Sequence, residues 1–170
     1  MGRAGVEQLL YLLDEAFGTT SGRWEGGQSF LANLRSATPE DWLWLPPGGA
    51  RTIRNIVVHV GECKYVYDNH AFGDASMRWD RPGTVPSVSN SDAPVDVIEW
   101  LEQGHRRFRE SIARLDDGEL RRPRPVNWGE TKETRWIIRV VIEHDLYHAG
   151  EINHIRSLRQ GNDRWAWEQG

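Results

Sequence analysis

The sequence predicts an all-α protein, a four-helix bundle in which two of the connections are long loops. Apolar residues recur with the three- and four-residue spacing of amphipathic helices along most of the chain, and strand-like alternation is nearly absent. The two long connections, at about residues 74–92 and 116–131, are polar or rich in serine, proline and glycine. At 170 residues, the chain fits one domain, residues 1–170, with a core that needs no disulfide. We therefore expect helices packed around one core, with long loops that could cover a site.

The first helical region is interrupted. Residues 6–17 carry one amphipathic stripe and residues 30–34 carry another. The segment Gly-Thr-Thr-Ser-Gly at 18–22 predicts a break between them. Thr38 is then typical of an N-cap and Pro39 of a first helical position, which together predict a short helix.

Three longer helices are expected after this short one. Their apolar stripes place them at about residues 52–72, 94–115 and 133–159. Gly73 is a stop signal at the end of the first of these helices. Asp92 is the expected N-cap of the second.

Composition excludes several classes of partner. The net charge is −4, and Lys64 and Lys132 are the only lysines, so nucleic acid is not expected as a partner. Cys63 is the only cysteine, which rules out an intrachain disulfide and fits a reducing cytoplasm. The apolar run at 9–13 is too short for a signal peptide, and no segment is long enough to span a membrane. We expect a cytoplasmic protein that acts on a small-molecule substrate, away from any membrane.

His144 and His148 are the most informative residues of the chain. Residues four apart on a helix differ by about 40° around the axis and about 6 Å along it, so both imidazoles can reach one metal ion. Two hydrogen-bonded core histidines are the alternative. The pair lies on the apolar seam of the last helix, whose members are Ile137, Val141, His144, His148, Ile152 and Ile155.

A third ligand is expected from His59, at the border of the apolar stripe of the helix at 52–72. Three histidines from facing helices would hold a metal with at least one position open, as in catalytic sites. His70 competes with His59 for this role, because it lies on nearly the same face about three turns further on. Cys63 offers a different reading, a closed structural zinc shell with the three histidines. His105 and His154 fall away from these seams and are expected at the surface or its edge.

Carboxylates near the histidines are candidates for supporting roles. Glu151 and Asp145 could each accept a hydrogen bond from a ligating imidazole or act as a general base. For Glu143, a solvated position is the stronger interpretation. Tyr147 could line a pocket or simply pack on the helix flank.

These segments resemble the DinB-like superfamily of metal-binding proteins, which is unrelated to the DNA polymerase that shares the name. Residues 51–60, Arg-Thr-Ile-Arg-Asn-Ile-Val-Val-His-Val, look like the family's second helix with its first metal histidine. Residues 144–152, His-Asp-Leu-Tyr-His-Ala-Gly-Glu-Ile, are similar to its His-Asp-x-Tyr-His-x-Gly-Gln-Ile signature. The Pro-Gly-rich turn before Arg51, preceded by a Thr-Pro-Glu segment and a tryptophan, is the third point of resemblance.

The resemblance implies an up-down-down-up four-helix bundle, frequently a homodimer, with a divalent metal on His59, His144 and His148. Characterised relatives include thiol-dependent transferases and isomerases that use mycothiol or bacillithiol, and a metal domain of ergothioneine synthesis. This chain departs from the family pattern at Glu151, where glutamine is common. A carboxylate there could tighten metal binding or change the charge of the open site.

Two kinds of function follow as hypotheses. The first is a metal-dependent enzyme, either a transferase that uses a thiol or a hydrolase, with zinc, nickel or iron equally suited to three imidazoles. With one cysteine of its own, the protein would take its thiol from a low-molecular-weight thiol cosubstrate. Arg135 or Arg139 could hold the carboxylates of that cosubstrate, or could be surface charges. The second hypothesis is a non-catalytic metal- or ligand-binding module used in stress response or regulation.

Overall fold

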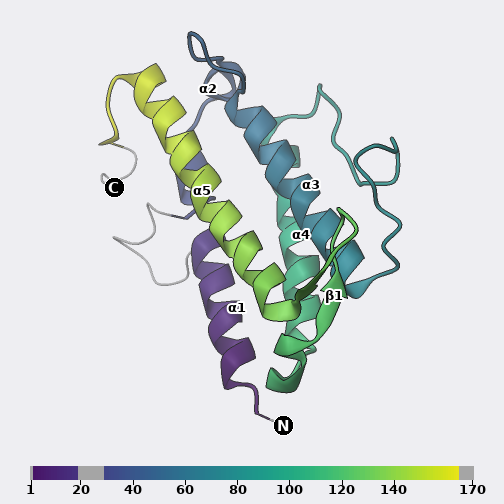
Figure 1. Ribbon diagram of the computed structural model, residues 1–170. Helices are drawn as coiled ribbons and strands as arrows, with labels where there is room; N and C mark the ends of the chain where they lie inside the picture. Colours follow the sequence, from purple (N-terminus) through teal and green to yellow (C-terminus); the bar gives the residue numbers. More distant parts are fainter. Residues whose placement is uncertain (1, 19–28, 165–170) are drawn as a thin grey trace.

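Four long helices form most of the structure, a computed structural model that describes residues 2–18 and 29–164 (Figure 1). The helices are α1 (Ala4–Phe17), α3 (Ile53–Phe72), α4 (Pro94–Ala113) and α5 (Thr134–Gln160). Within the described residues, the only strands are β1 (Pro123–Pro125) and β2 (Thr131–Glu133), which pair in an antiparallel hairpin. The expected all-α class is therefore confirmed. None of the described helices is long and apolar enough to cross a lipid bilayer.

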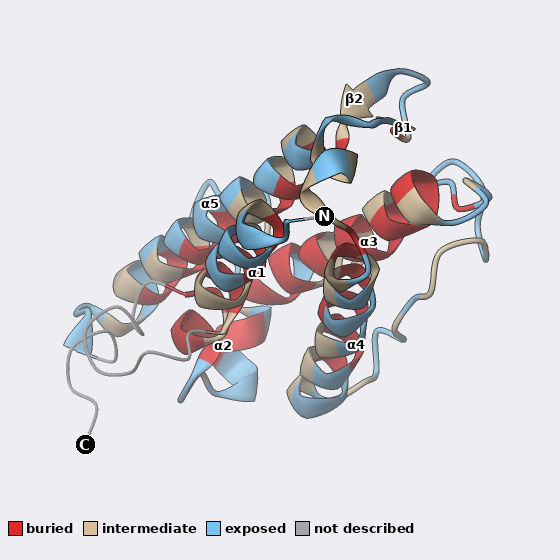
Figure 2. Ribbon diagram, turned by 90° about the horizontal axis from the view of Figure 1, so that it is seen from below, coloured by how far each residue is buried: buried red, intermediate tan, exposed pale blue. Residues whose placement is uncertain are grey.

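The long helices enclose two apolar clusters. Helix α3 packs against α4 and α5, and α1 packs against the same two helices (Figure 1). One cluster surrounds Ile56 and Trp42 near the start of α3, and the other surrounds Phe108 and Ile137 toward the hairpin. Burying each such side chain contributes about 1.5–3 kcal/mol to folding. Figure 2 shows the buried surfaces of the helices turned toward one another, as the apolar stripes predict.

Local hydrogen bonds fix two of the predicted helix starts. The short helix α2 (Pro39–Leu43) begins after Thr38, whose Oγ1 accepts the Asp41 N–H at 3.3 Å. Helix α3 begins in the same way after Thr52, whose Oγ1 accepts the Asn55 N–H at 3.2 Å. Both caps complete a reciprocal capping box, which satisfies amide groups that the first turn leaves free. The second cap matters for function because α3 carries His59.

Two expected details of the helices are wrong. The stripe at 30–34 forms only a single 3-10 turn, η2 (Ala32–Leu34), because the Phe30 N–H donates back to the Ala16 carbonyl at the end of α1. Asp92 does not cap α4: its carboxylate accepts the Ser89 N–H at 2.8 Å, within its own turn. Of the predicted break at 18–22, residues 19–22 lie outside the described residues.

The connection before α5 is more ordered than a loop. It contains the 3-10 helix η3 (Asp117–Arg121) and then the hairpin. Arg124 of β1 donates to the Ala71 carbonyl at 3.2 Å and to Thr134 Oγ1 at 2.9 Å, which ties the hairpin to the end of α3 and the start of α5. Each strand has only three residues, and β1 contains two prolines, so neither shows an alternating pattern that would predict it from the sequence.

Candidate metal centre

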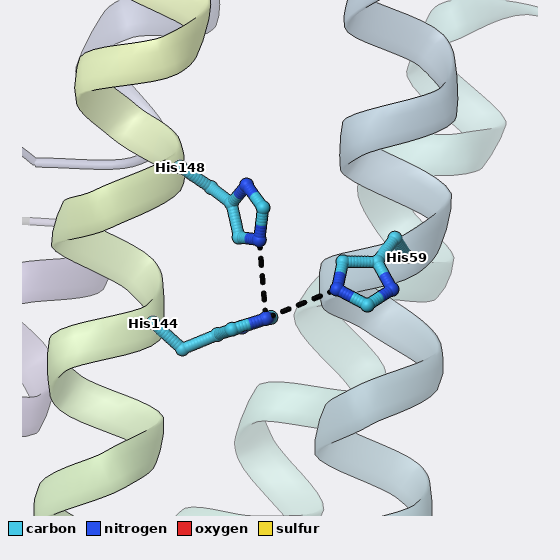
Figure 3. Close-up of side chains that lie close together, drawn as sticks. All are labelled: His59, His144 and His148. Carbon is cyan, nitrogen blue, oxygen red and sulfur yellow. Dashed lines mark hydrogen bonds between the residues drawn. The ribbon is translucent and has the colours of Figure 1, made fainter. Parts of the chain in front are cut away.

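The three predicted ligands meet between α3 and α5 (Figure 3). His59 comes from α3, and His144 and His148 come from adjacent turns of α5. Nε2 of His144 lies 3.1 Å from Nε2 of His59 and 3.1 Å from Nε2 of His148. One nitrogen from each ring lies within 4.8 Å of the other two, so the set could hold a metal ion.

Hydrogen bonds between the rings cannot satisfy this arrangement. An imidazole nitrogen has a single in-plane position, which carries either a proton or a lone pair. Nε2 of His144 faces two other nitrogens at 3.1 Å, so at most one of these contacts can be a well-aligned hydrogen bond. With metal–nitrogen bonds of about 2.0–2.1 Å, ligand nitrogens lie about 2.9 Å apart in octahedral geometry and about 3.4 Å apart in tetrahedral geometry. The two distances of 3.1 Å from His144 fall between these values and suit ligands of one cation.

The surroundings keep the rings neutral, which is the form that binds a metal. Burial, with the neighbouring His148 and His59 rings, lowers the pKa of His144 from 6.5 to about 3. Burial also lowers the pKa of His59, with smaller contributions from His148 and from the positive charge of Arg51. For His148, burial lowers the pKa in spite of the opposing effect of the Glu151 carboxylate. All three rings therefore offer lone pairs near neutral pH.

Glu151 orients His148. The Nδ1–H of His148 donates to Oε2 of Glu151 at 2.8 Å, because a carboxylate can only accept. This bond fixes the proton on Nδ1 and leaves the Nε2 lone pair aimed at the other two rings. The second Glu151 oxygen, Oε1, lies 3.3 Å from Nη2 of Arg51. Arg51 lies in the turn before α3, and no motif or spacing in the sequence indicates its role at the site.

Asp145 is held elsewhere. Nζ of Lys64 donates to both of its carboxylate oxygens, at 2.8 and 2.7 Å, and the two side chains are 1% and 0% exposed. Both oxygens therefore face α3, and no hydrogen bond joins Asp145 to the three imidazoles in the described contacts. Its place is next to His144 in a buried ion pair between α3 and α5, which is a structural position and not that of a base facing solvent. The expectation that it supports a ligating imidazole by a hydrogen bond is not met.

The two competing candidate ligands, His70 and Cys63, do not belong to the histidine cluster. His70 is buried and its Nε2 donates to the Met77 carbonyl at 2.7 Å, so it anchors the loop after α3. Cys63 approaches only the His59 ring, at 3.8 and 3.9 Å from its two nitrogens, and does not belong to the group within 4.8 Å. Burial raises the pKa of the Cys63 thiol to about 12, which disfavours the thiolate that metals bind.

Of the two remaining histidines, one is exposed and the other is buried. His154 is exposed on α5, as expected. His105 was expected at the surface or its edge, and this is wrong. It is 6% exposed and stacks on the Phe17 ring with centroids 3.8 Å apart, because α4 turns it toward the end of α1.

The other residues named from the sequence lie on the surface of α5. Arg135 pairs with Glu133 at 2.6 Å and Arg139 with Glu143 at 3.6 Å, so both arginines are engaged with neighbouring carboxylates in solvent. Tyr147 is 68% exposed, with its ring edge-on to His148 at a centroid distance of 5.0 Å. Of these residues, only Tyr147 borders the histidine cluster.

Comparison with known families agrees with this site. A family model described as the DinB superfamily matches residues 25–152, a range that contains all three histidines and Glu151. No curated protein matches the chain.

Proposed function

Because the chain belongs to the DinB superfamily, we propose that it is a metal-dependent enzyme whose divalent ion is held by His59, His144 and His148. The observation that carries this proposal is the meeting of three Nε2 atoms, two of them 3.1 Å from the third, in a geometry that hydrogen bonds leave unsatisfied. The lowered pKa values of the rings support it, since neutral imidazoles bind metals.

We further propose a reaction on a small molecule, either transfer to a thiol or hydrolysis. A divalent ion in this set would supply Lewis acidity, which favours the deprotonated form of a thiol or of water. The Cys63 thiol is buried, and burial raises its pKa to about 12, so a reacting thiol would come from a low-molecular-weight cosubstrate. Zinc, nickel and iron all suit three nitrogen ligands.

Glu151 has two roles in this proposal. Its Oε2 keeps the Nδ1 proton on His148, so that Nε2 stays available as a ligand. Its other oxygen is 3.3 Å from Arg51, on a side chain that is 27% exposed, and could accept a proton from a substrate once that ion pair opens. Asp145 has no such access, and we propose that its ion pair with Lys64 positions His144.

The family also suggests features of the assembly. We propose an up-down-down-up bundle that works as a homodimer in the cytoplasm. Sedimentation of the purified chain would test the oligomeric state directly.

Metal content tests the proposal. The full chain, purified without chelating resin, should carry about one divalent ion per chain by elemental analysis. His59→Ala should lose most of this metal yet unfold cooperatively, because His59 is half-buried and lies at the edge of the core. His154→Ala, which removes an exposed histidine of α5, is the matched control and should keep its metal.

Two results would overturn the proposal. One is a wild-type protein that contains no metal and takes up none from zinc, nickel or iron solutions. The other is full metal content in His59→Ala. X-ray absorption of the loaded protein would separate the enzyme from a non-catalytic module, because a shell closed by Cys63 sulfur leaves no position for a substrate.

A further inference from the structure

A cleft borders the histidine cluster on the side of Glu151. It lies between the turn at residues 46–51 and the C-terminal part of α5. Figure 1 shows this part of α5 at the end of the molecule where α3 begins. Its volume is about 370 Å³, within the range of small-molecule sites. Glu151 lines the cleft and also accepts the hydrogen bond from His148, so one side chain joins the cleft to the metal ligands.

The cleft has one polar wall and one apolar wall. Arg51 and Glu151 form the polar wall, and His154 lies at its edge. Ile155 and Leu158 of α5, together with the two prolines of the turn, form the apolar lining. Leu158 is 54% exposed, so its apolar surface is accessible to a molecule bound in the cleft. An occupant that matches both walls has a charged group and an apolar body.

Arg51 selects the sign of that charged group. Its side chain is 41% exposed, and its ion pair with Glu151 uses one nitrogen at 3.3 Å. A guanidinium has five N–H donors in a fork that matches a carboxylate, and within the described contacts most of them are unused. The charges of Arg51 and Glu151 cancel, and a divalent ion on the histidines would add two positive charges beside them. The wall therefore attracts an anion when the metal is bound.

We propose that this cleft binds a small carboxylate with an apolar body, held by Arg51. The inference rests on the proposed function in one respect, that the bound molecule is the substrate or thiol cosubstrate of the metal centre. A carboxylate fits better than a phosphate, because Arg51 is the only arginine or lysine among the described residues that line the cleft. Its guanidinium fork can pair with both oxygens of a carboxylate, whereas a phosphate dianion would keep a third oxygen and a second charge unpaired.

Calorimetric titration of the zinc-loaded full chain tests this with hexanoate and its neutral counterpart hexanamide. Hexanoate should bind about tenfold or more tightly than hexanamide, as expected for hydrogen bonds to a charged group. Arg51→Gln should abolish this preference while its zinc content stays that of the wild type. A preference that survives in Arg51→Gln would show that the carboxylate binds elsewhere, for example on the zinc, and would overturn the proposal.

A second pair of variants does not depend on Arg51. Leu158→Glu places a like charge in the cleft and should weaken hexanoate binding about fivefold or more. Leu146→Glu, at a leucine of α5 that is 47% exposed and outside the cleft, is the matched control and should have no effect. Equal effects of the two variants would overturn the location. Displacement of hexanoate by inorganic phosphate at equal concentration would overturn the ligand class.

The two proposals fail separately. If the chain takes up no metal, the proposed function fails, and a hexanoate preference that needs Arg51 still supports the cleft in the metal-free protein. If the loaded protein does not distinguish hexanoate from hexanamide, the cleft assignment fails while the metal centre stands.

Discussion

Removing the charge of Lys64 should destabilise the protein more than removing any surface charge. Lys64→Met keeps the length and apolar body of the side chain but leaves the Asp145 carboxylate without the two hydrogen bonds of 2.7 and 2.8 Å. Both side chains are nearly inaccessible to water, at 1% and 0% exposed. Breaking one partner of such a pair costs about 3–5 kcal/mol, because a charge stays buried without compensation. A loss of about 3–5 kcal/mol lowers the unfolding temperature by roughly 6–20 °C for a domain of this size.

Urea unfolding of four proteins measures the effect: wild type, Lys64→Met, Asp145→Asn and the double variant. The double variant leaves a neutral pair, so it should lose only about 1–3 kcal/mol, less than Lys64→Met alone. Lys132→Met is the control, because the only other lysine makes a solvent-exposed pair with Glu130, which contributes little to stability. A loss below 1 kcal/mol in Lys64→Met, or strictly additive losses, would refute the reasoning.

Three further predictions concern packing, metal affinity and pH. Gly61→Ala should lower the free energy of unfolding by about 1–3 kcal/mol, because the added Cβ would overlap the Trp100 ring. Gly150→Ala, in open space on α5, should raise it by about 0.5–1 kcal/mol. Thermal unfolding measures both, and the opposite order would contradict the packing. Glu151→Ala should weaken zinc affinity about 10–100-fold in a chelator competition, and unchanged affinity would remove its orienting role. Because the pKa of His144 is lowered from 6.5 to about 3, the unfolded chain binds a proton that the folded, metal-free protein does not, so stability should fall as the pH decreases through this window. Between pH 6.5 and 5.0, the free energy of unfolding measured in urea should fall less in His144→Gln than in the wild type. An identical fall in both proteins would contradict a neutral His144.

Local sequence signals determined much of the framework. The Thr38 and Thr52 caps fixed where two helices begin, since a side-chain oxygen two bonds from its own Cα needs no tertiary partner to accept an amide N–H. Helical spacing also placed His144 and His148 one turn apart on one face, because that relation is a property of the helix itself. The family signature at residues 144–152 is also visible in the sequence, because all of it lies within this one helix.

Partners from distant segments were decided by the tertiary structure. The sequence left His59 and His70 as competitors, and only the packing of α3 on α5 brings His59 to within 3.1 Å of His144. Asp145 was indistinguishable from Glu151 as a supporting carboxylate until the fold placed Lys64 against it. His105, which was expected at the surface or its edge, is buried because its ring stacks on Phe17 of α1.

The cleft beside the metal centre was also decided by the tertiary structure. Arg51 lies a hundred residues from Glu151 in the chain, and no periodicity relates a turn before one helix to a position on another. Sequence alone therefore determined which helices form and which residues share a face, because hydrogen bonding and side-chain direction within a helix are local. Which faces meet, and so which charges pair and where a cleft remains, depends on how side chains from all four helices pack together, and that was decided only by the tertiary structure.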